Sequence, residues 1–517
     1  MNKPFLKFGT GGLRGIMGDG PGQINEQTIA FVTQGLANVL LQIPSPHSVL
    51  IGFDSRLCSA DFAKVAARVL AGNGIRAHLF SSLRPTPLIS FGCLFKNCSA
   101  AIMITASHNP SYYNGYKVYW KDGAQIVEPL DKEIIRALDQ IKSPQHIKQA
   151  TFPHPLIQIE NEDIDYAYLQ TLSDYQNLPV QNALHGKDLK ILYSNLHGAG
   201  ITMVPSALKS WGFSSISFVE EQKEPDGRFP TVTSPNPEEK EALELGIRDL
   251  IKLKCDILFV TDPDADRMGV VVLKDGFPTI LSGNQLAVIL LYHLCNTFKK
   301  EGKPLASMGF ITTIVTTPLF KEIVTSFQAT CFEVLTGFKY IAAKMREHPL
   351  PFLFAAEESY GYLLGSFVRD KDGISASCLT AEAALSMKLQ KKTLLDLLFE
   401  IYEKYGVYRE SQLSLFFKGK EDLMTALRKS PPKEIAGIKF DKTIDYLQGV
   451  GELPKSDVLA LHLQDGSRCI IRPSGTEPKL KIYLFTSCTS FSSVEEGIEL
   501  CDTKLHAMSQ FFHDYAK

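Results

Sequence analysis

Short apolar runs rich in β-branched residues alternate along the chain with longer stretches in which apolar residues recur every three or four positions. Short apolar runs are typical of buried strands, and the longer spacing is typical of helices with one buried face. We predict strands at residues 48–52, 100–105, 189–193, 255–260 and 309–315. Helices are predicted at residues 26–41, 59–72, 131–141, 237–252 and 284–298. Alternation of this kind predicts α/β layers with largely parallel sheets.

The C-terminal part of the chain has a different pattern. Strands predicted at 458–462, 468–471 and 481–486 are joined by turns and followed by a helix at 493–513, which favours an α+β domain. A chain of 517 residues is too long for a single hydrophobic core. We therefore predict three α/β domains at 1–185, 186–282 and 283–405, and a smaller α+β domain at 406–517.

Composition and charge narrow the possible partners. The chain is 44% hydrophobic and 21% charged with a formal net charge of −2, so it has no basic excess for a nucleic-acid backbone. The N-terminus lacks the apolar stretch of a signal peptide, and the longest apolar run, 286–292, is too short to span a bilayer. We expect a cytoplasmic protein with no nucleic-acid or membrane partner. Its ten cysteines include no Cys-x-x-Cys pair and are expected to be reduced thiols.

The first candidate for chemistry is the segment 102–110, in which an apolar strand leads into Thr-Ala-Ser-His-Asn-Pro. Ligands of α/β sheets bind beyond the carboxyl ends of strands, so Ser107 beside His108 is well placed to act as a nucleophile. In isolation the segment is more typical of a turn in which Ser107 or Asn109 caps backbone groups.

The second candidate is Asp262-Pro263-Asp264-Ala265-Asp266-Arg267, directly after a predicted strand. Carboxylates at alternate positions of an extended segment project to one side and can enclose a hard cation. An EF-hand is excluded because Arg267 and Leu273 stand where that loop requires glycine and glutamate. Three carboxylates leave an incomplete shell, which suits Mg²⁺; the alternative is a solvated acidic turn.

Three further loops contain groups suited to phosphates or sugars. Segment 472–479 combines an arginine, two hydroxyls and a glycine, and could cradle a phosphate, although a simple Gly/Pro turn has the same composition. Segment 355–361 offers carboxylates and a hydroxyl that could bind sugar hydroxyls, or could begin a helix. Segment 8–15 is a glycine-rich loop with Arg14 and lacks the Gly-Lys-Ser/Thr ending of a Walker A motif.

Together and in this order, the five loops resemble those of the α-D-phosphohexomutase superfamily, the phosphoglucomutases and phosphomannomutases. Segments 9–15, 113–120, 262–267 and 336–340 are most similar to the branch of phosphoglucomutases and phosphopentomutases. Shorter segments at 52–56 and 84–87 fit the same pattern. The resemblance implies three related α/β domains with mixed, largely parallel sheets and a smaller C-terminal α+β domain around a central cleft.

The resemblance also implies roles for individual residues. Ser107 matches the phosphoserine, and Asp262, Asp264 and Asp266 match the carboxylates that bind Mg²⁺ together with a phosphoserine oxygen. Residues beside the transferring group are His108, Lys117 and Arg267, with Lys117 the first choice and His108 the second for general acid/base catalysis. Substrate contacts are implied for Arg14, Lys339, Glu357, Ser359, Arg472, Ser474, Gly475 and Thr476. Ala356 departs from the pattern, since many relatives have glycine there.

The activity implied is phosphoryl transfer from Ser107 to O6 of a sugar 1-phosphate, with glucose 1,6-bisphosphate as intermediate and activator. The similarity favours glucose, with mannose or pentose phosphates as alternatives. A metal-dependent phosphohydrolase and a non-catalytic sugar phosphate sensor are the competing classes. The expected partners are small-molecule sugar phosphates, and the protein is expected to be a monomer or homodimer.

Overall fold

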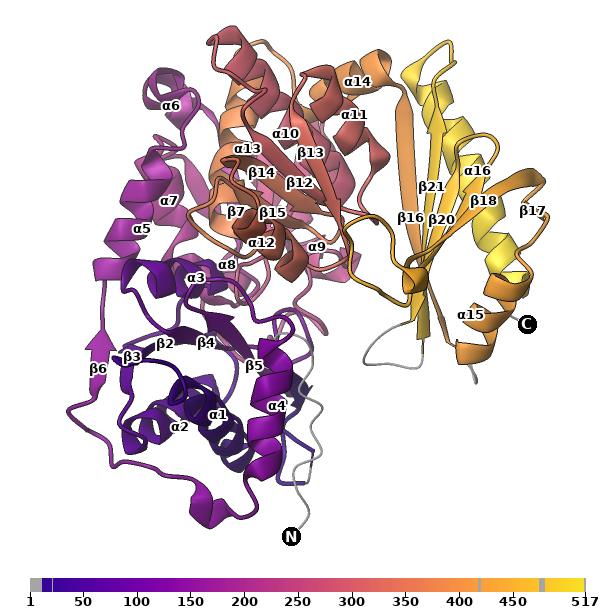
Figure 1. Cartoon of the computed structure of the whole chain (residues 1–517). Helices are drawn as coiled ribbons and strands as arrows, with labels where there is room; N and C mark the ends of the chain where they lie inside the picture. Colours follow the sequence, from indigo (N-terminus) through magenta and orange to yellow (C-terminus); the bar gives the residue numbers. More distant parts are fainter. Residues whose placement is uncertain (1–11, 21, 417–419, 474–478, 516–517) are drawn as a thin grey trace.

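Four β-sheets follow one another along the chain, each with its own helices (Figure 1). The structure is a computed structural model that describes residues 12–20, 22–416, 420–473 and 479–515. The first three sheets are mixed and the fourth is antiparallel. This confirms the predicted fold class, whereas the domain boundaries stay a prediction.

The first sheet has the order β1-β5-β4-β2-β3-β6, in which the last four strands run parallel and β1 and β5 pair antiparallel. Its strands are β1 (Gly12–Ile16), β2 (Ser48–Phe53), β3 (Arg76–Phe80), β4 (Ala100–Ile104), β5 (Tyr113–Trp120) and β6 (Ile157–Glu160). Its helices are α1 (Glu26–Leu40), α2 (Ser59–Gly72), α3 (Thr86–Phe95), α4 (Leu130–Gln140) and α5 (Asp163–Ser173).

The second sheet has the order β11-β10-β9-β7-β8, and the third has the order β13-β12-β14-β15. The second contains β7 (Ile191–Ser194), β8 (Ile216–Phe218), β9 (Ile257–Thr261), β10 (Met268–Lys274) and β11 (Phe277–Leu281), with α6 (Pro179–His185), α7 (Val204–Ser210), α8 (Glu220–Lys223) and α9 (Lys240–Leu253). The third contains β12 (Gly309–Thr313), β13 (Thr330–Val334), β14 (Phe352–Glu357) and β15 (Gly361–Leu364), with α10 (Gly283–Lys300), α11 (Pro318–Ser326), α12 (Phe338–Glu347), α13 (Gly373–Lys388) and α14 (Leu394–Tyr405).

The fourth sheet has the order β16-β21-β20-β19-β18-β17 and is covered by a long C-terminal helix. Its elements are β16 (Val407–Phe416), β17 (Glu434–Ile435), β18 (Ile438–Asp445), β19 (Leu459–Leu463), β20 (Arg468–Pro473), β21 (Lys479–Cys488), α15 (Lys420–Lys429) and α16 (Val494–Tyr515). The antiparallel pairing confirms the predicted α+β character of this part.

One predicted boundary is wrong by several residues. Helix α9 begins at Lys240, whereas the sequence pattern predicted residue 237. The reason is a turn built on Asn236, whose side-chain oxygen accepts a hydrogen bond from Glu238 N at 3.2 Å while its carbonyl accepts one from Glu239 N. This turn holds Glu238 outside the helix, where it reaches the site described below.

The first three domains share one continuous hydrophobic core. Buried residues from all three contact one another in a single cluster, and α13 of the third domain packs against α7 and β10 of the second. The C-terminal domain has its own core, and it meets the others in two places: Val407, Val494 and Cys501 belong to the large cluster, and a smaller apolar cluster includes Ile314 of the third domain and Tyr483 of the fourth. It stands to one side of the other three in Figure 1.

All ten cysteines are free, as predicted, and most of them are buried. Among the described residues, no helix is both long enough and apolar enough to cross a membrane.

Candidate active site

The serine predicted as nucleophile lies in the loop between β4 and β5. Ser107 is 2% exposed and its backbone has φ 53°, a left-handed conformation that is uncommon for a residue with a side chain. Its backbone N–H donates to Thr105 Oγ1 at 2.8 Å, and its hydroxyl donates to Asp262 Oδ2 at 2.7 Å. His108 Nδ1 is 3.2 Å from the same hydroxyl. The loop therefore aims the serine at the second domain.

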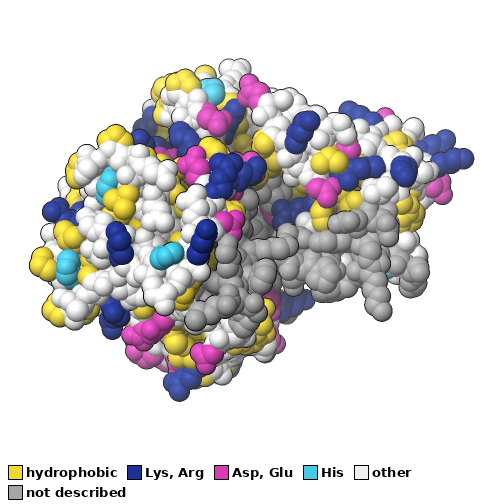
Figure 2. Space-filling view, turned by 60° about the horizontal axis from the view of Figure 1, so that its bottom comes forward, with side chains coloured by type: hydrophobic (Ala, Val, Ile, Leu, Met, Phe, Trp, Pro, Cys, Tyr) yellow, Lys and Arg dark blue, Asp and Glu magenta, His cyan; other side chains and the backbone are white. Residues whose placement is uncertain are grey.

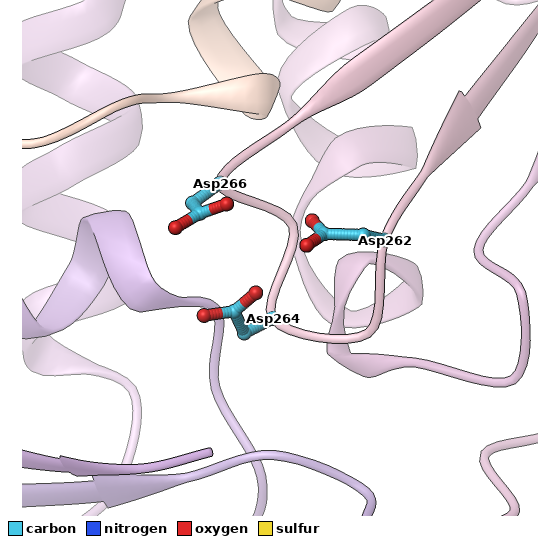
Figure 3. Close-up of side chains that lie close together, drawn as sticks. All are labelled: Asp262, Asp264 and Asp266. Atoms are coloured by element: carbon cyan, nitrogen blue, oxygen red, sulfur yellow. The ribbon is translucent and has the colours of Figure 1, made fainter. Parts of the chain in front are cut away.

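The three aspartates converge from a tight turn after β9 (Figure 3). Ala265 N donates to Asp262 O at 2.9 Å, and Ala265 has φ 49°. The prediction of an extended segment with alternating side chains is therefore wrong, because this turn curls the backbone around the carboxylates. The predicted convergence is confirmed: one ligand atom from each of Asp262, Asp264 and Asp266 lies within 4.8 Å of the others, and all three residues are buried.

Two oxygens of this cluster fit a metal ion. Asp264 Oδ1 and Asp266 Oδ1 are buried without a hydrogen-bond partner. Buried carboxylate oxygens are normally satisfied, because leaving one without a partner costs free energy. A cation bound among the three carboxylates would satisfy both atoms and offset the repulsion between the charges. The residues present therefore suit a hard cation.

Cationic side chains surround the aspartates. Lys117 on β5 donates to Asp264 Oδ2 at 2.7 Å and to Asp266 Oδ2 at 3.0 Å. Arg267 donates through Nη1 to Glu238 Oε1 at 2.5 Å, and its backbone N–H donates to Asp262 Oδ1 at 3.1 Å. The predicted residues His108, Lys117 and Arg267 are thus brought together with the serine loop and the aspartates.

Two carboxylates of the cluster have pKa values shifted in opposite directions. Burial, then the neighbouring Asp264 and Asp266, raise the pKa of Asp262 well above its ordinary value. Burial alone would raise the pKa of Asp266 too, but Lys117 and Lys371 hold that pKa well below its usual range. Burial together with nearby arginines lowers the pKa of His108 well below its ordinary value.

Lys371 was missed by the sequence reasoning. It precedes α13, and its Nζ lies 3.3 Å from Asp266 Oδ2, 3.4 Å from Asp370 Oδ1 and 4.0 Å from Glu357 Oε1. Although burial favours the neutral amine, Asp266 and Asp370 raise the pKa of Lys371 above its ordinary value. The alternating charges of Arg-Asp-Lys-Asp at 369–372 between apolar segments were the available signal.

The sugar-binding candidates lie on the third domain. Strand β14 extends to Glu357, and Ala355 and Ala356 continue its pairing with β12 and β15. Ser359 Oγ donates to Glu357 Oε1 at 3.1 Å in the turn that follows. Burial raises the pKa of Glu357, and burial together with the Glu357 charge raises the pKa of Glu358 to about 8.

The remaining candidates lie around this centre. Arg14 on β1 donates to Asn109 Oδ1 of the serine loop at 2.9 Å. Lys339 lies in the first turn of α12, and its Nζ lies over the Tyr340 ring, 4.7 Å from its centroid. Arg472 on β20 is close enough for its charge to lower the pKa of Glu358, opposing the upward shift.

Ser474, Gly475 and Thr476 lie outside the described residues. Charged side chains of both signs gather beside the hollow between the first three domains and the C-terminal domain (Figure 2).

The amino-acid sequence matches four family models between residues 6 and 485. They describe the alpha/beta/alpha domains I, II and III and the C-terminal domain of phosphoglucomutase/phosphomannomutase, at residues 6–145, 166–276, 282–405 and 424–485. A phosphoglucomutase from Staphylococcus haemolyticus is 36% identical over 514 residues, which cover 95% of this chain and 92% of that protein. One from Staphylococcus aureus strain MRSA252 is 35% identical over 518 residues, with coverages of 95% and 92%.

Solved structures show the same fold. The parafusin phosphoglucomutase of Paramecium, in an open form, superposes with a TM-score of 0.75 at 20% identity and covers 99% of this chain and 96% of its own. A phosphoglucomutase/phosphomannomutase family protein from Burkholderia thailandensis gives a TM-score of 0.70 at 19% identity, with 97% of each chain covered.

Proposed function

Because the chain belongs to the phosphoglucomutase/phosphomannomutase family, we propose that it interconverts α-D-glucose 1-phosphate and glucose 6-phosphate through a phosphorylated Ser107. The main supporting observation is the buried Ser107 hydroxyl, 2.7 Å from a carboxylate of the aspartate cluster. An ordinary exposed turn would not combine a left-handed serine backbone with a hydroxyl that contacts one of three buried aspartates. The relatives named phosphoglucomutase support glucose as the sugar.

The reaction needs two transfers of opposite direction. Phosphorylated Ser107 transfers its phosphoryl group to O6 of glucose 1-phosphate, so the serine P–O bond breaks and glucose 1,6-bisphosphate forms. The bisphosphate then turns around in the site. The phosphoryl group on O1 transfers to Ser107, which releases glucose 6-phosphate and restores the phosphorylated enzyme. Added glucose 1,6-bisphosphate activates unphosphorylated protein by the second transfer alone.

Asp262, Asp264 and Asp266 would hold Mg²⁺ together with an oxygen of phosphorylated Ser107. The buried Oδ1 atoms of Asp264 and Asp266, which have no partner, support this assignment. When bound, the ion supplies positive charge next to the phosphoryl oxygens, which is the main requirement of phosphoryl transfer.

The chain's own cations supply the rest of the positive charge. Lys117 and Arg267 lie at the aspartates, and Arg14 lies at the serine loop. Lys117 stays the first choice for general acid/base catalysis and His108 the second; the 3.2 Å separation of His108 Nδ1 and Ser107 Oγ supports the latter.

Substrate binding is assigned to two domains. Glu357 and Ser359 would hold sugar hydroxyls with Lys339 nearby, and Arg472 with Ser474, Gly475 and Thr476 would hold the phosphate that is not transferred. The guanidinium can bind either phosphate in two hydrogen bonds, as the turning of the bisphosphate requires. We further propose that the protein acts in the cytoplasm as a monomer or homodimer.

The test is phosphorus NMR of the protein with Mg²⁺, trace glucose 1,6-bisphosphate and, in parallel, glucose, mannose, ribose and glucosamine phosphates. We expect the fastest interconversion with glucose, and we expect Ser107→Ala to lose nearly all turnover while keeping its fold by circular dichroism. Faster reaction of mannose or ribose phosphate would keep the mechanism and change the sugar. Release of inorganic phosphate alone, or near-normal turnover by Ser107→Ala, would refute the proposal.

A further inference from the structure

The carbonyl groups of the serine loop converge on one buried guanidinium. Arg56, which is 3% exposed, donates through Nη2 to Ser107 O at 2.6 Å and through Nη1 to Pro110 O at 2.8 Å and Tyr113 O at 3.1 Å. Nη2 also donates to Asn109 O. Inward-pointing carbonyls need donors, and a guanidinium has five in a fixed planar arrangement. A single side chain therefore satisfies the loop that presents the nucleophile.

The hydrogen bonds from Arg56 offset the cost of a strained backbone conformation at Ser107. The backbone of Ser107 is left-handed, which costs free energy for a residue with a side chain. Such a conformation persists only where surrounding contacts stabilise it. Arg56 contacts the carbonyl of Ser107 itself and three more in the next six residues, so it fixes the loop from the strained position onward.

Arg56 is in turn anchored in the first domain. Its Nε lies 3.4 Å from Asp54 Oδ2, and Asp54 Oδ1 accepts from Arg56 N at 3.0 Å and from Ser59 Oγ at 2.8 Å. Asp54 N donates to Ile104 O at the end of β4, the strand that leads into the serine loop. The guanidinium is therefore anchored, through Asp54, to the end of β4, the strand that leads into the loop whose carbonyls it binds.

The second domain covers the other face of the guanidinium. The Phe229 ring, 1% exposed, lies 4.9 Å from Arg56 Cζ, and Gly227 forms a backbone bridge with Arg56. A Cβ at Gly227 would come within 2.3 Å of Leu57 N, so only glycine allows this approach. Ser234 of the same segment donates to His108 O at 2.9 Å. The segment 227–234 thus contacts both Arg56 and the serine loop.

We propose that Arg56 is the positioning residue of the phosphoryl-accepting serine, and that Phe229 holds its guanidinium so that docking of the second domain fixes the serine loop against the aspartates. The proposal rests on the proposed function, because it assumes that Ser107 accepts the phosphoryl group. A misplacement of about 1 Å at a reacting atom can cost about 100-fold in rate. Loosening the loop should therefore slow phosphoryl transfer while leaving the sugar-binding contacts of the third and fourth domains in place.

The variants are Arg56→Lys, Arg56→Ala and Phe229→Leu, with Arg76→Lys on an exposed position of β3 as the matched control. Lysine keeps the charge but cannot serve four carbonyls with one planar group. The first readout is the rate at which labelled glucose 1,6-bisphosphate phosphorylates Ser107 in a single turnover. The second is the separation of kcat from KM in steady state.

For Arg56→Lys we expect kcat and the single-turnover rate to fall about 100-fold, with KM within about 3-fold of wild type. Phe229→Leu should lose about 3- to 30-fold by removing the cation–π contact. Arg56→Ala should regain rate when guanidinium chloride is added below denaturing concentrations, but not with sodium chloride at equal ionic strength. A residue that only stabilised the fold would show neither the kcat-specific loss nor the rescue.

These experiments distinguish failure of the positioning role from failure of the proposed function. If wild-type protein turns over and becomes phosphorylated on Ser107, while Arg56→Lys has normal kcat or a defect only in KM, the positioning role is wrong and the proposed function stands. If Arg56→Ala does not fold, an unchanged kcat for folded Phe229→Leu contradicts the role of the second domain. If wild-type protein is never phosphorylated on Ser107, the proposed function falls and this inference falls with it.

Discussion

Replacing Asp264 by asparagine separates the metal-binding role of the aspartate turn from its structural role. Asp264 Oδ2 accepts from Thr86 Oγ1 at 2.6 Å and from Lys117 Nζ at 2.7 Å, whereas Oδ1 has no partner. An asparagine carbonyl can keep both hydrogen bonds and place its amide where Oδ1 was. The variant therefore loses one negative charge and one metal ligand with little change in packing.

The expected loss of affinity follows from the geometry. An ion among three oxygens that lie within 4.8 Å of one another is no farther than about 4 Å from each. At that separation a divalent ion and one carboxylate interact by about 8 kcal/mol at an effective dielectric constant of about 20. If the asparagine oxygen and water replace about half to three-quarters of this, the loss is about 2–4 kcal/mol, or about 30- to 700-fold in the dissociation constant of Mg²⁺.

Isothermal titration with Mg²⁺ and the metal dependence of turnover provide the assay. Thermal unfolding without metal should show no loss of stability, because removing one of three buried like charges relieves repulsion. Asp256→Asn is the matched control: Asp256 lies just before β9 and pairs with Lys388, and its replacement should leave Mg²⁺ affinity unchanged. A metal titration of Asp264→Asn that superposes on wild type would refute the assigned site.

Two further variants test other parts of the structure. Arg472→Ala should raise KM for glucose 1-phosphate about 10- to 100-fold, the range expected for hydrogen bonds to a charged group, and unaltered kinetics would remove it from the substrate site. Glu382→Gln should lower calorimetric stability by about 2–6 kcal/mol, because an amide faces the donors of Asn177 and His293, whereas Glu400→Gln, at a half-buried surface position, should change little. Burial alone would raise the pKa of Glu382, but His293 and Asn177 lower it, so this stabilisation is present above the ordinary carboxyl pKa and is lost as the pH falls through the lowered value. The difference between Glu382→Gln and wild type should therefore narrow in acid, and a constant difference would contradict the assignment.

Local patterns predicted the elements well because each has a distinct signal. The predicted helix at 59–72 coincides with α2, and the predicted strand at 255–260 differs from β9 by two residues at its start and one at its end. The errors occur where side chains compete with the regular pattern. Asn236 delays α9 by a turn of its own, and the aspartate turn after β9 folds back through a left-handed Ala265.

The site was predictable where one segment contains its own chemistry, and less so where partners come from distant segments. Ser107 and Asp262 were identified as separate motifs, but their 2.7 Å contact depends on how two domains dock. The alternating charges around Lys371 and the short segment 52–56 that contains Arg56 do not by themselves show what either side chain contacts. Their roles follow only from distances to Asp266 and to the carbonyls of the serine loop.

The packing between the domains divides the site into a part whose geometry is fixed by a large shared core and a part that is held by a smaller interface. The serine loop, the aspartates, Lys117 and Glu357 belong to three domains that share one core, so their mutual positions are fixed by packing. Arg472 belongs to the fourth domain, which contributes only a few residues near its start and its last helix to that core, has a core of its own, and meets the third domain near Arg472 through the smaller cluster that includes Ile470 and Tyr483. A bisphosphate that turns around needs a constant geometry at the reacting atoms and a phosphate contact that can be released and made again. We therefore expect substitutions in that smaller cluster to change KM and intermediate release, and substitutions between Arg56 and Phe229 to change the chemical step.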